Sequence, residues 1–247
     1  MLRPLLTFLS LIFFTAPILA DDTEPLALRL LKKSEALMRS DGTLAEYKID
    51  ILRPDWQRSM TFRSHDDPLH NRFRMEILSP SKTKGTVFLK VDNVLSMYLP
   101  KLRRQINISP AMMQDPWMGS DFNNQDLLDT KFMIEGHTHK IIEQTGEGED
   151  AIYTIESIPY PSTTVTWKKL IRHIRGDGIP LDVEYHCKTK VSRRMTFDQV
   201  QSMGGRTIPT RWTMTPQDES GKSTVVTLQS IQFNAPMSDE LFTPVKK

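Results

Sequence analysis

The sequence lacks the features that mark most enzymes, nucleic-acid-binding proteins and disulfide-rich secreted domains. Its 247 residues include one cysteine, Cys187, which excludes an intramolecular disulfide framework. Cys187 stands in a strand-like segment and is interpreted as a small packing residue rather than a nucleophile. A net charge of +2 gives no support for nucleic-acid binding. The sequence has no recognisable phosphate-binding glycine loop, nucleophile elbow or general acid–base pair. We therefore expect no enzyme, no catalytic residues and no cofactor.

Long hydrophobic runs are also missing, except for a short one at the N-terminus. Leu5–Phe14 is mainly apolar and follows Arg3, but it is far shorter than the roughly 20 residues that cross a bilayer. Small residues end the run, which is typical of a signal peptide over residues 1–20, cleaved after Ala20. An uncleaved N-terminal anchor is the alternative. Because Asp21, not a cysteine, follows the cleavage point, we expect a periplasmic protein that is not lipidated.

Most of the mature chain alternates between apolar and polar residues, after one amphipathic helix that begins near Pro25. Twelve segments have this period or end at glycine-rich turns: 46–51, 56–62, 73–77, 86–91, 94–99, 132–143, 151–158, 163–175, 181–186, 191–200, 207–215 and 223–233. The pattern predicts a mostly β (α+β) protein: one curved antiparallel sheet, or half-barrel, of about 11 strands covered by helices. No linker divides the chain, so we expect a single domain over residues 21–247.

Residues 109–130 break the strand pattern. Two prolines and a glycine exclude a regular strand, and Ser120 or Asp121 is expected to cap a short helix that runs to about Asp129. The segment is rich in large apolar residues: Met112, Met113, Trp117, Met118 and Phe122. It is expected either to plug the open end of the sheet or to form a flexible wall of a ligand cavity.

The chain resembles the outer-membrane lipoprotein-sorting protein family, relatives of the LolA and LolB lipoprotein carriers, over residues 43–247. Both the order and the spacing of the matching stretches fit that family. These stretches are Gly85–Lys90, Tyr98–Arg104, Met118–Phe122 with Asp126 and Leu127, Ile208–Met214, and Leu241–Thr243. Around 163–175 the match is loose, because the tyrosine expected before Trp167 is absent.

The resemblance implies a half-barrel closed by helices around a hydrophobic cavity for acyl chains. Thirteen methionines suit such a cavity, because the thioether side chain is flexible and polarisable. The residues expected to line it are Trp56, Phe62, Phe73, Met75, Met97, Met112, Met113, Trp117, Met118, Phe122, Trp212 and Met214. The alternative is that these side chains form ordinary core.

Paired arginines are the first polar signal. Arg103 and Arg104 are candidates for a polar cavity mouth that receives a phosphate or an acidic patch of a partner, and Arg193 with Arg194 is a similar pair. Exposed strand faces carry such pairs routinely, which is the simpler interpretation.

Two other polar pairs have a spacing compatible with metal binding. His137 and His139 share a strand face, but no third ligand is evident, and we expect a solvated pair and no metal. Asp121 and Asp126 either cap the short helix or bind a cation, and the cap is the simpler account.

These observations predict a periplasmic carrier or binder of a lipid, or of the acyl chain of a lipoprotein, in envelope transport. The resemblance also implies transient membrane-associated partners, including an inner-membrane transporter of the RND (resistance-nodulation-division) type. One alternative is a periplasmic sensor or adaptor that binds envelope lipids for a membrane partner. A lipid-acting enzyme is the other.

Overall fold

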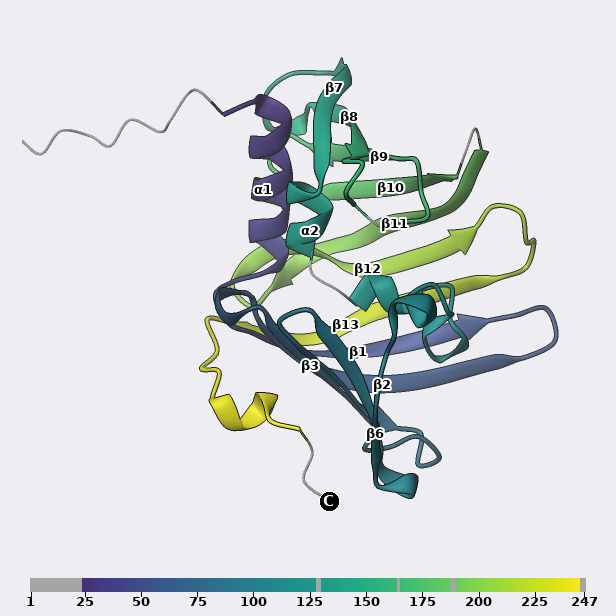
Figure 1. The fold of residues 1–247 in the computed structure, drawn as a ribbon. Helices are drawn as coiled ribbons and strands as arrows, with labels where there is room; N and C mark the ends of the chain where they lie inside the picture. Colours follow the sequence, from purple (N-terminus) through teal and green to yellow (C-terminus); the bar gives the residue numbers. More distant parts are fainter. Residues whose placement is uncertain (1–23, 128–129, 164, 188–189, 245–247) are drawn as a thin grey trace, which may run out of the picture.

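The computed structural model describes residues 24–127, 130–163, 165–187 and 190–244 (Figure 1). The predicted signal peptide, residues 1–20, lies outside the described residues. The described chain forms one antiparallel sheet of thirteen strands. The strands are β1 (Thr43–Leu52), β2 (Gln57–Asp67), β3 (Arg72–Ser79), β4 (Val87–Val91), β5 (Val94–Leu99), β6 (Arg104–Asn107), β7 (His137–Thr145), β8 (Ile152–Pro159), β9 (Lys169–Arg175), β10 (Pro180–Cys187), β11 (Lys190–Met203), β12 (Arg206–Pro216) and β13 (Ser223–Phe233).

The strand order is β6-β5-β4-β3-β2-β1-β13-β12-β11-β10-β9-β8-β7. All neighbours are consecutive in sequence except β1 and β13, which pair in the middle, with Thr43 opposite Phe233. The two edges, β6 and β7, are consecutive in the chain. The segment between them, residues 108–136, must therefore cross from one edge to the other, and we call it the crossover. Its described parts, residues 108–127 and 130–136, lie over one face of the sheet (Figure 1).

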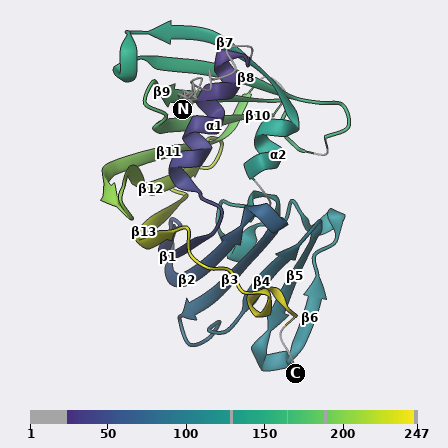
Figure 2. The ribbon, with the colours of Figure 1, turned by 90° about the vertical axis from the view of Figure 1, so that its left-hand side faces the viewer.

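Two helices cover the part of the sheet formed by its later strands (Figures 1 and 2). They are α1 (Leu26–Met38) and α2 (Thr130–Glu135). Leu30 and Leu31 of α1 pack against Ile134 of α2 and against Ile155 and Ile174 of the sheet. Among the described residues, neither helix is both long and apolar enough to cross a membrane. Figure 2 shows the sheet bent, so that its two halves face in different directions.

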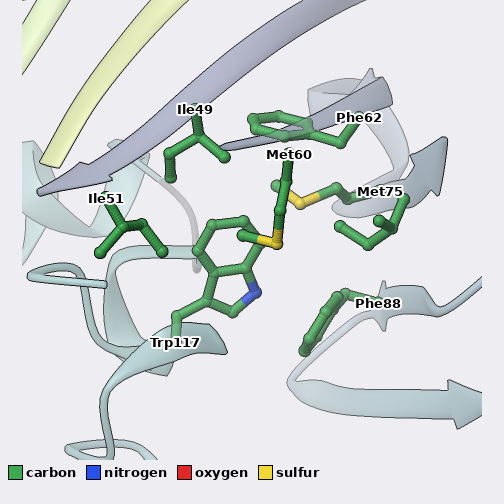
Figure 3. Close-up of a cluster of buried hydrophobic side chains, with 8 residues drawn as sticks. Ile49, Ile51, Met60, Phe62, Met75, Phe88 and Trp117 are labelled. Carbon is green, nitrogen blue, oxygen red and sulfur yellow. The ribbon is translucent and has the colours of Figure 1, made fainter. Parts of the chain in front are cut away.

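The early strands build the largest core cluster, which Figure 3 shows. Ile49 and Ile51 of β1 alternate onto one face and are fully buried, as the period-two pattern requires. Met60 and Phe62 of β2 and Met75 of β3 pack beside them. The alternation seen in the sequence therefore places one apolar face of each strand inward.

The predicted fold class is correct, with differences in detail. The sheet has thirteen strands rather than about 11: each of the twelve predicted segments contains one strand, and the four-residue edge strand β6, which the pattern does not predict, is the thirteenth. The segment 132–143 is not one strand: α2 ends at Glu135, and β7 begins after Gly136. Likewise, among the described residues of the segment 163–175, only Lys169–Arg175 is strand.

The short helix predicted from Ser120 or Asp121 is wrong in its bounds. Residues 117–127 form two single 3-10 turns, Trp117–Gly119 and Asn124–Leu127, and α2 starts only at Thr130. Met118 and Gly119 both have positive φ, which breaks any continuous helix here. Asp129 lies outside the described residues.

Candidate functional site

A cavity of about 460 Å³ lies between the inner face of the sheet, the two helices and the second half of the crossover. This volume is in the range of small-molecule sites, roughly 300–1,000 Å³. Its wall is mainly apolar. The apolar wall residues are Leu31, Met38, Tyr47, Pro68, Phe62, Phe73, Met75, Phe122, Leu127, Met133, Ile134, Ile174, Pro180, Val183, Tyr185, Met195, Phe197, Trp212 and Val226.

Five of the twelve side chains expected at a cavity lie in its wall. They are Phe62, Phe73, Met75, Phe122 and Trp212. The other seven lie elsewhere: Trp56, Met97, Met112, Met113, Trp117, Met118 and Met214. Four of these pack in the core clusters: Trp117 and Met118 of the crossover, and Met97 and Met214 of strands. Residues on the same face of a strand divide between core and cavity according to their position along the strand. Strand alternation identifies a face but not this division.

Trp56 is the clearest error among the predicted wall residues. It precedes β2 instead of belonging to it, and the residue is 44% exposed. Two cations lie over its ring, with the guanidinium carbons of Arg53 and Arg58 each 5.6 Å from the ring centroid. The tryptophan therefore forms a surface cation–π group outside the cavity.

The crossover segment serves as both plug and wall. Trp117 is buried in the core, with its ring centroid 5.9 Å from that of Phe62 and 5.8 Å from that of Phe88 (Figure 3). Phe122 and Leu127, after the turn, line the cavity instead. The two alternatives considered for residues 109–130 thus apply to different halves of the segment.

Two largely buried ion pairs hold the crossover on the sheet. Asp121 Oδ2 accepts a hydrogen bond from Arg53 Nη1 at 3.0 Å. Arg193 donates two hydrogen bonds to the Asp126 carboxylate, at 2.7 and 2.8 Å, and Asp126 also accepts one from the Asn123 backbone N–H. The predicted capping role is thus present at Asp126, combined with an ion pair. The part of the chain that the structure describes contains no metal-binding cluster of three or more His, Cys, Asp or Glu residues.

The predicted polar mouth is misplaced. Arg103 has a left-handed backbone conformation in the turn after β5, and Arg104 begins the edge strand β6. Both side chains are exposed, and neither lies in the cavity wall. The basic residues that do line the cavity are Arg39, Arg72, Lys90 and Arg172. These four residues are far apart in the sequence, so a search for adjacent basic residues does not find them.

The expectation of a solvated histidine pair is also wrong. His137 is buried against Trp167, whose Nε1 donates to His137 Nε2 at 3.3 Å. His139 Nε2 donates to the Ile134 carbonyl oxygen at 2.7 Å, and its Nδ1 lies 2.8 Å from Ser157 Oγ. Since Nε2 carries the proton of the neutral ring, Nδ1 accepts from the serine hydroxyl. The ring thereby links α2 to the sheet.

This environment predicts that stability decreases in acid. Burial lowers the pKa of His139 below its ordinary value of 6.5, and the positive charge of Arg172 acts in the same direction, against the hydrogen bond to Ile134. The unfolded chain therefore binds a proton at a higher pH than the folded chain does. The stabilisation is fully present above about pH 7 and is lost as the pH falls below about 6.5, through the lowered folded pKa.

Urea unfolding between about pH 7.5 and 5 measures this effect. We expect His139→Gln to flatten the decrease of the unfolding free energy with falling pH, even if its stability at pH 7.5 is lower. His65 provides a comparison, because burial lowers its pKa as well, and His65→Gln should remove a separate part of the slope. An unchanged slope in His139→Gln would contradict the assignment.

A protein-family model described as "Uncharacterized protein" matches residues 70–246. The matched part runs from the turn before β3 to the C-terminal segment, and it includes most of the sheet and the whole crossover. No curated protein sequence matches the chain.

Solved structures match over nearly the whole described chain. A DUF1329 family protein from Desulfovibrio piger has a TM-score of 0.78 at 17% identity, covering 88% of this chain and 95% of that one. A putative outer membrane lipoprotein-sorting protein domain from Vibrio parahaemolyticus has a TM-score of 0.74 at 20% identity, with 87% and 95% covered. A LolA superfamily protein from Nitrosomonas europaea has a TM-score of 0.73 at 17% identity, with 88% and 97% covered. The resemblance read from the sequence is confirmed, and at these identities it establishes the fold.

Proposed function

The chain belongs to the family of uncharacterized proteins whose model matches residues 70–246, and from its LolA-like fold and its cavity we propose that it carries a lipid, or the acyl chain of a lipoprotein, in the periplasm. The binding domain is proposed to comprise residues 21–247. Export by the N-terminal signal peptide, and delivery to or from an inner-membrane transporter of the RND type, are parts of the same proposal.

The cavity is the observation that carries this proposal. Its methionine and aromatic side chains come from the sheet, from α1 and α2, and from the crossover. An acyl chain gains free energy by leaving water for such a surface, roughly 0.8 kcal/mol for each buried CH₂ group. Methionine side chains such as Met75, Met133 and Met195 adapt to chains of different shape.

The direct test is native mass spectrometry of the mature protein released gently from the periplasm, followed by identification of bound molecules. A co-purifying lipid or acylated peptide at about one molecule per chain supports a carrier. An unliganded mass, with no uptake when lipids are offered, would contradict the proposal.

Adjacent valines on β13 give a matched pair of variants. Val226 lines the cavity, and Val225 faces the opposite side of the sheet because successive strand residues alternate. We expect Val226→Trp to fill part of the cavity and to weaken binding of a fluorescent fatty acid by at least about tenfold. Val225→Trp should bind as the natural protein does, and thermal melts of both variants report on folding. Equal affinities in two folded variants would place the binding site elsewhere.

A further inference from the structure

Arg172 of β9 brings a buried positive charge to the cavity wall. Only 7% of the residue is exposed. Its guanidinium donates hydrogen bonds to Ser157 Oγ and, at 3.0 Å, to the Met133 carbonyl oxygen. Within the described ranges no carboxylate pairs with it. Burial lowers the pKa of Arg172 to about 10, so the side chain is still protonated at neutral pH.

The acidic residues of the cavity wall do not compensate this charge, because each is bound to another cation. Arg39 pairs with both Glu35 and Asp66, at 2.9 and 2.6 Å. Asp126 pairs with Arg193 at 2.7 Å, and Asp182 pairs with Arg194 at 2.7 Å. A buried charge with no counter-ion is costly, and a ligand anion would remove that cost.

Tyr185 of β10 offers a second donor beside Arg172. Arg172 pairs with Val183 across the two strands, so Tyr185 stands diagonally from it on the same face, and both line the cavity. The Tyr185 hydroxyl makes no hydrogen bond with any residue the structure describes. Burial raises its pKa to about 12, which keeps the hydroxyl protonated and able to donate.

The Tyr185 ring is fixed in place. Arg193 lies over it with 4.2 Å between the guanidinium carbon and the ring centroid, and Trp167 packs edge-on at 5.4 Å between ring centroids. The guanidinium of Arg172 is likewise held by its bonds to β8 and α2. Two donors are thus oriented before a ligand enters, which reduces the entropy lost on binding.

We propose that Arg172 and Tyr185 form an anion subsite that takes the terminal carboxylate or phosphate of an amphiphile whose hydrocarbon chain lies in the apolar part of the cavity. This rests on the proposed function and narrows its cargo to anionic amphiphiles. The neighbouring apolar wall, which includes Ile174, Met195 and Phe197, accepts the chain.

Four probes with the same twelve-carbon chain test this: dodecanoate, dodecyl phosphate, dodecanol and dodecyltrimethylammonium. Displacement of a neutral fluorescent lipid probe at pH 8 measures each affinity. We expect both anions to bind at least about tenfold more tightly than dodecanol, as charge-assisted hydrogen bonds require, and the cation to bind least. Equal affinities for the anions and dodecanol would overturn the anion subsite and leave the carrier standing. Failure of all four probes, and of the fluorescent lipid, would overturn the carrier as well.

Inorganic phosphate, offered without a chain, separates the two sources of the anion. It should not displace the probe or dodecyl phosphate at concentrations at which dodecyl phosphate is saturating. Displacement by phosphate alone would show that the site binds a free anion, and would overturn the proposal that its ligand is an amphiphile.

Variants locate the subsite. Arg172→Gln should remove most of the preference for the anions over dodecanol, and Arg172→Lys should retain part of this preference. Tyr185→Phe should lower the preference while the positive charge of Arg172 stays in place. Arg63→Gln is the control, because it removes a cation that pairs with Glu46 outside the cavity wall. An anion preference that persists in both Tyr185→Phe and folded Arg172→Gln would overturn the assignment.

Discussion

Replacing Trp117 with alanine is expected to lower the free energy of unfolding by about 3–5 kcal/mol. The residue is 3% exposed, and its ring packs among Ile51, Phe62 and Phe88, so removal of the ring leaves a cavity in the core (Figure 3). Trp117→Asp adds an unpaired buried charge to that loss, and the variant should fail to accumulate. Urea unfolding of the alanine variant and the yield of the aspartate variant measure these effects.

Trp56 is the matched control for this experiment. It is the same residue type, but it lies on the surface with two arginines over its ring, and Trp56→Ala should cost no more than about 1 kcal/mol. If both alanine variants have equal stability, the crossover does not plug the core. A large loss at Trp117 alone shows that the first half of the crossover stabilises the fold.

Breaking the ion pair between Asp126 and Arg193 is expected to cost about 3–5 kcal/mol, because either single substitution leaves a buried charge without its partner. The two side chains are only 11% and 14% exposed. Asp126→Leu and Arg193→Met should each destabilise strongly, whereas the double variant should recover much of the loss, since it leaves no unpaired charge. Chemical unfolding of all four proteins forms a double-mutant cycle that reports the coupling.

A second pair that involves β11 supplies the control. Arg211 and Asp198 form an ion pair in which the side chains are 41% and 39% exposed. Solvent screens such a pair, so Arg211→Met should leave the unfolding transition unchanged. Additive single effects at Asp126 and Arg193 would contradict the coupling and indicate that each residue acts through separate contacts.

Period-two alternation was sufficient to predict the sheet, because it reports directly which side chains face inward. Ile49 and Ile51 illustrate this: their alternation with charged residues fixed both the strand and its buried face. The edge strand β6 escaped prediction because an exposed four-residue strand buries no face. In the segment Phe132–Glu143 the sequence predicts a single strand, because the six residues of α2 are too few to show a helical period.

The cavity was harder to predict than the sheet. Trp56 and Trp117 are the same residue type, yet Trp56 lies on the surface and Trp117 in the core. Their different burial follows from the path of the crossover, which the sequence pattern does not reveal. The sequence around Arg172 does not show that this side chain is buried. It stands in a strand with three other basic residues, Lys169, His173 and Arg175, and it differs from them only in facing inward. Whether such a side chain is buried depends on contacts between segments that are distant in the sequence.

The seam between β1 and β13 has a consequence for how the protein is made. Its strands are separated by most of the chain, and β13 follows every other strand that the structure describes. The two meanders on either side have local contacts and are free to form earlier, but the centre of the sheet cannot close until residues 223–233 have emerged. Until then β1 has no neighbour on one side, and its unpaired backbone is open to other chains.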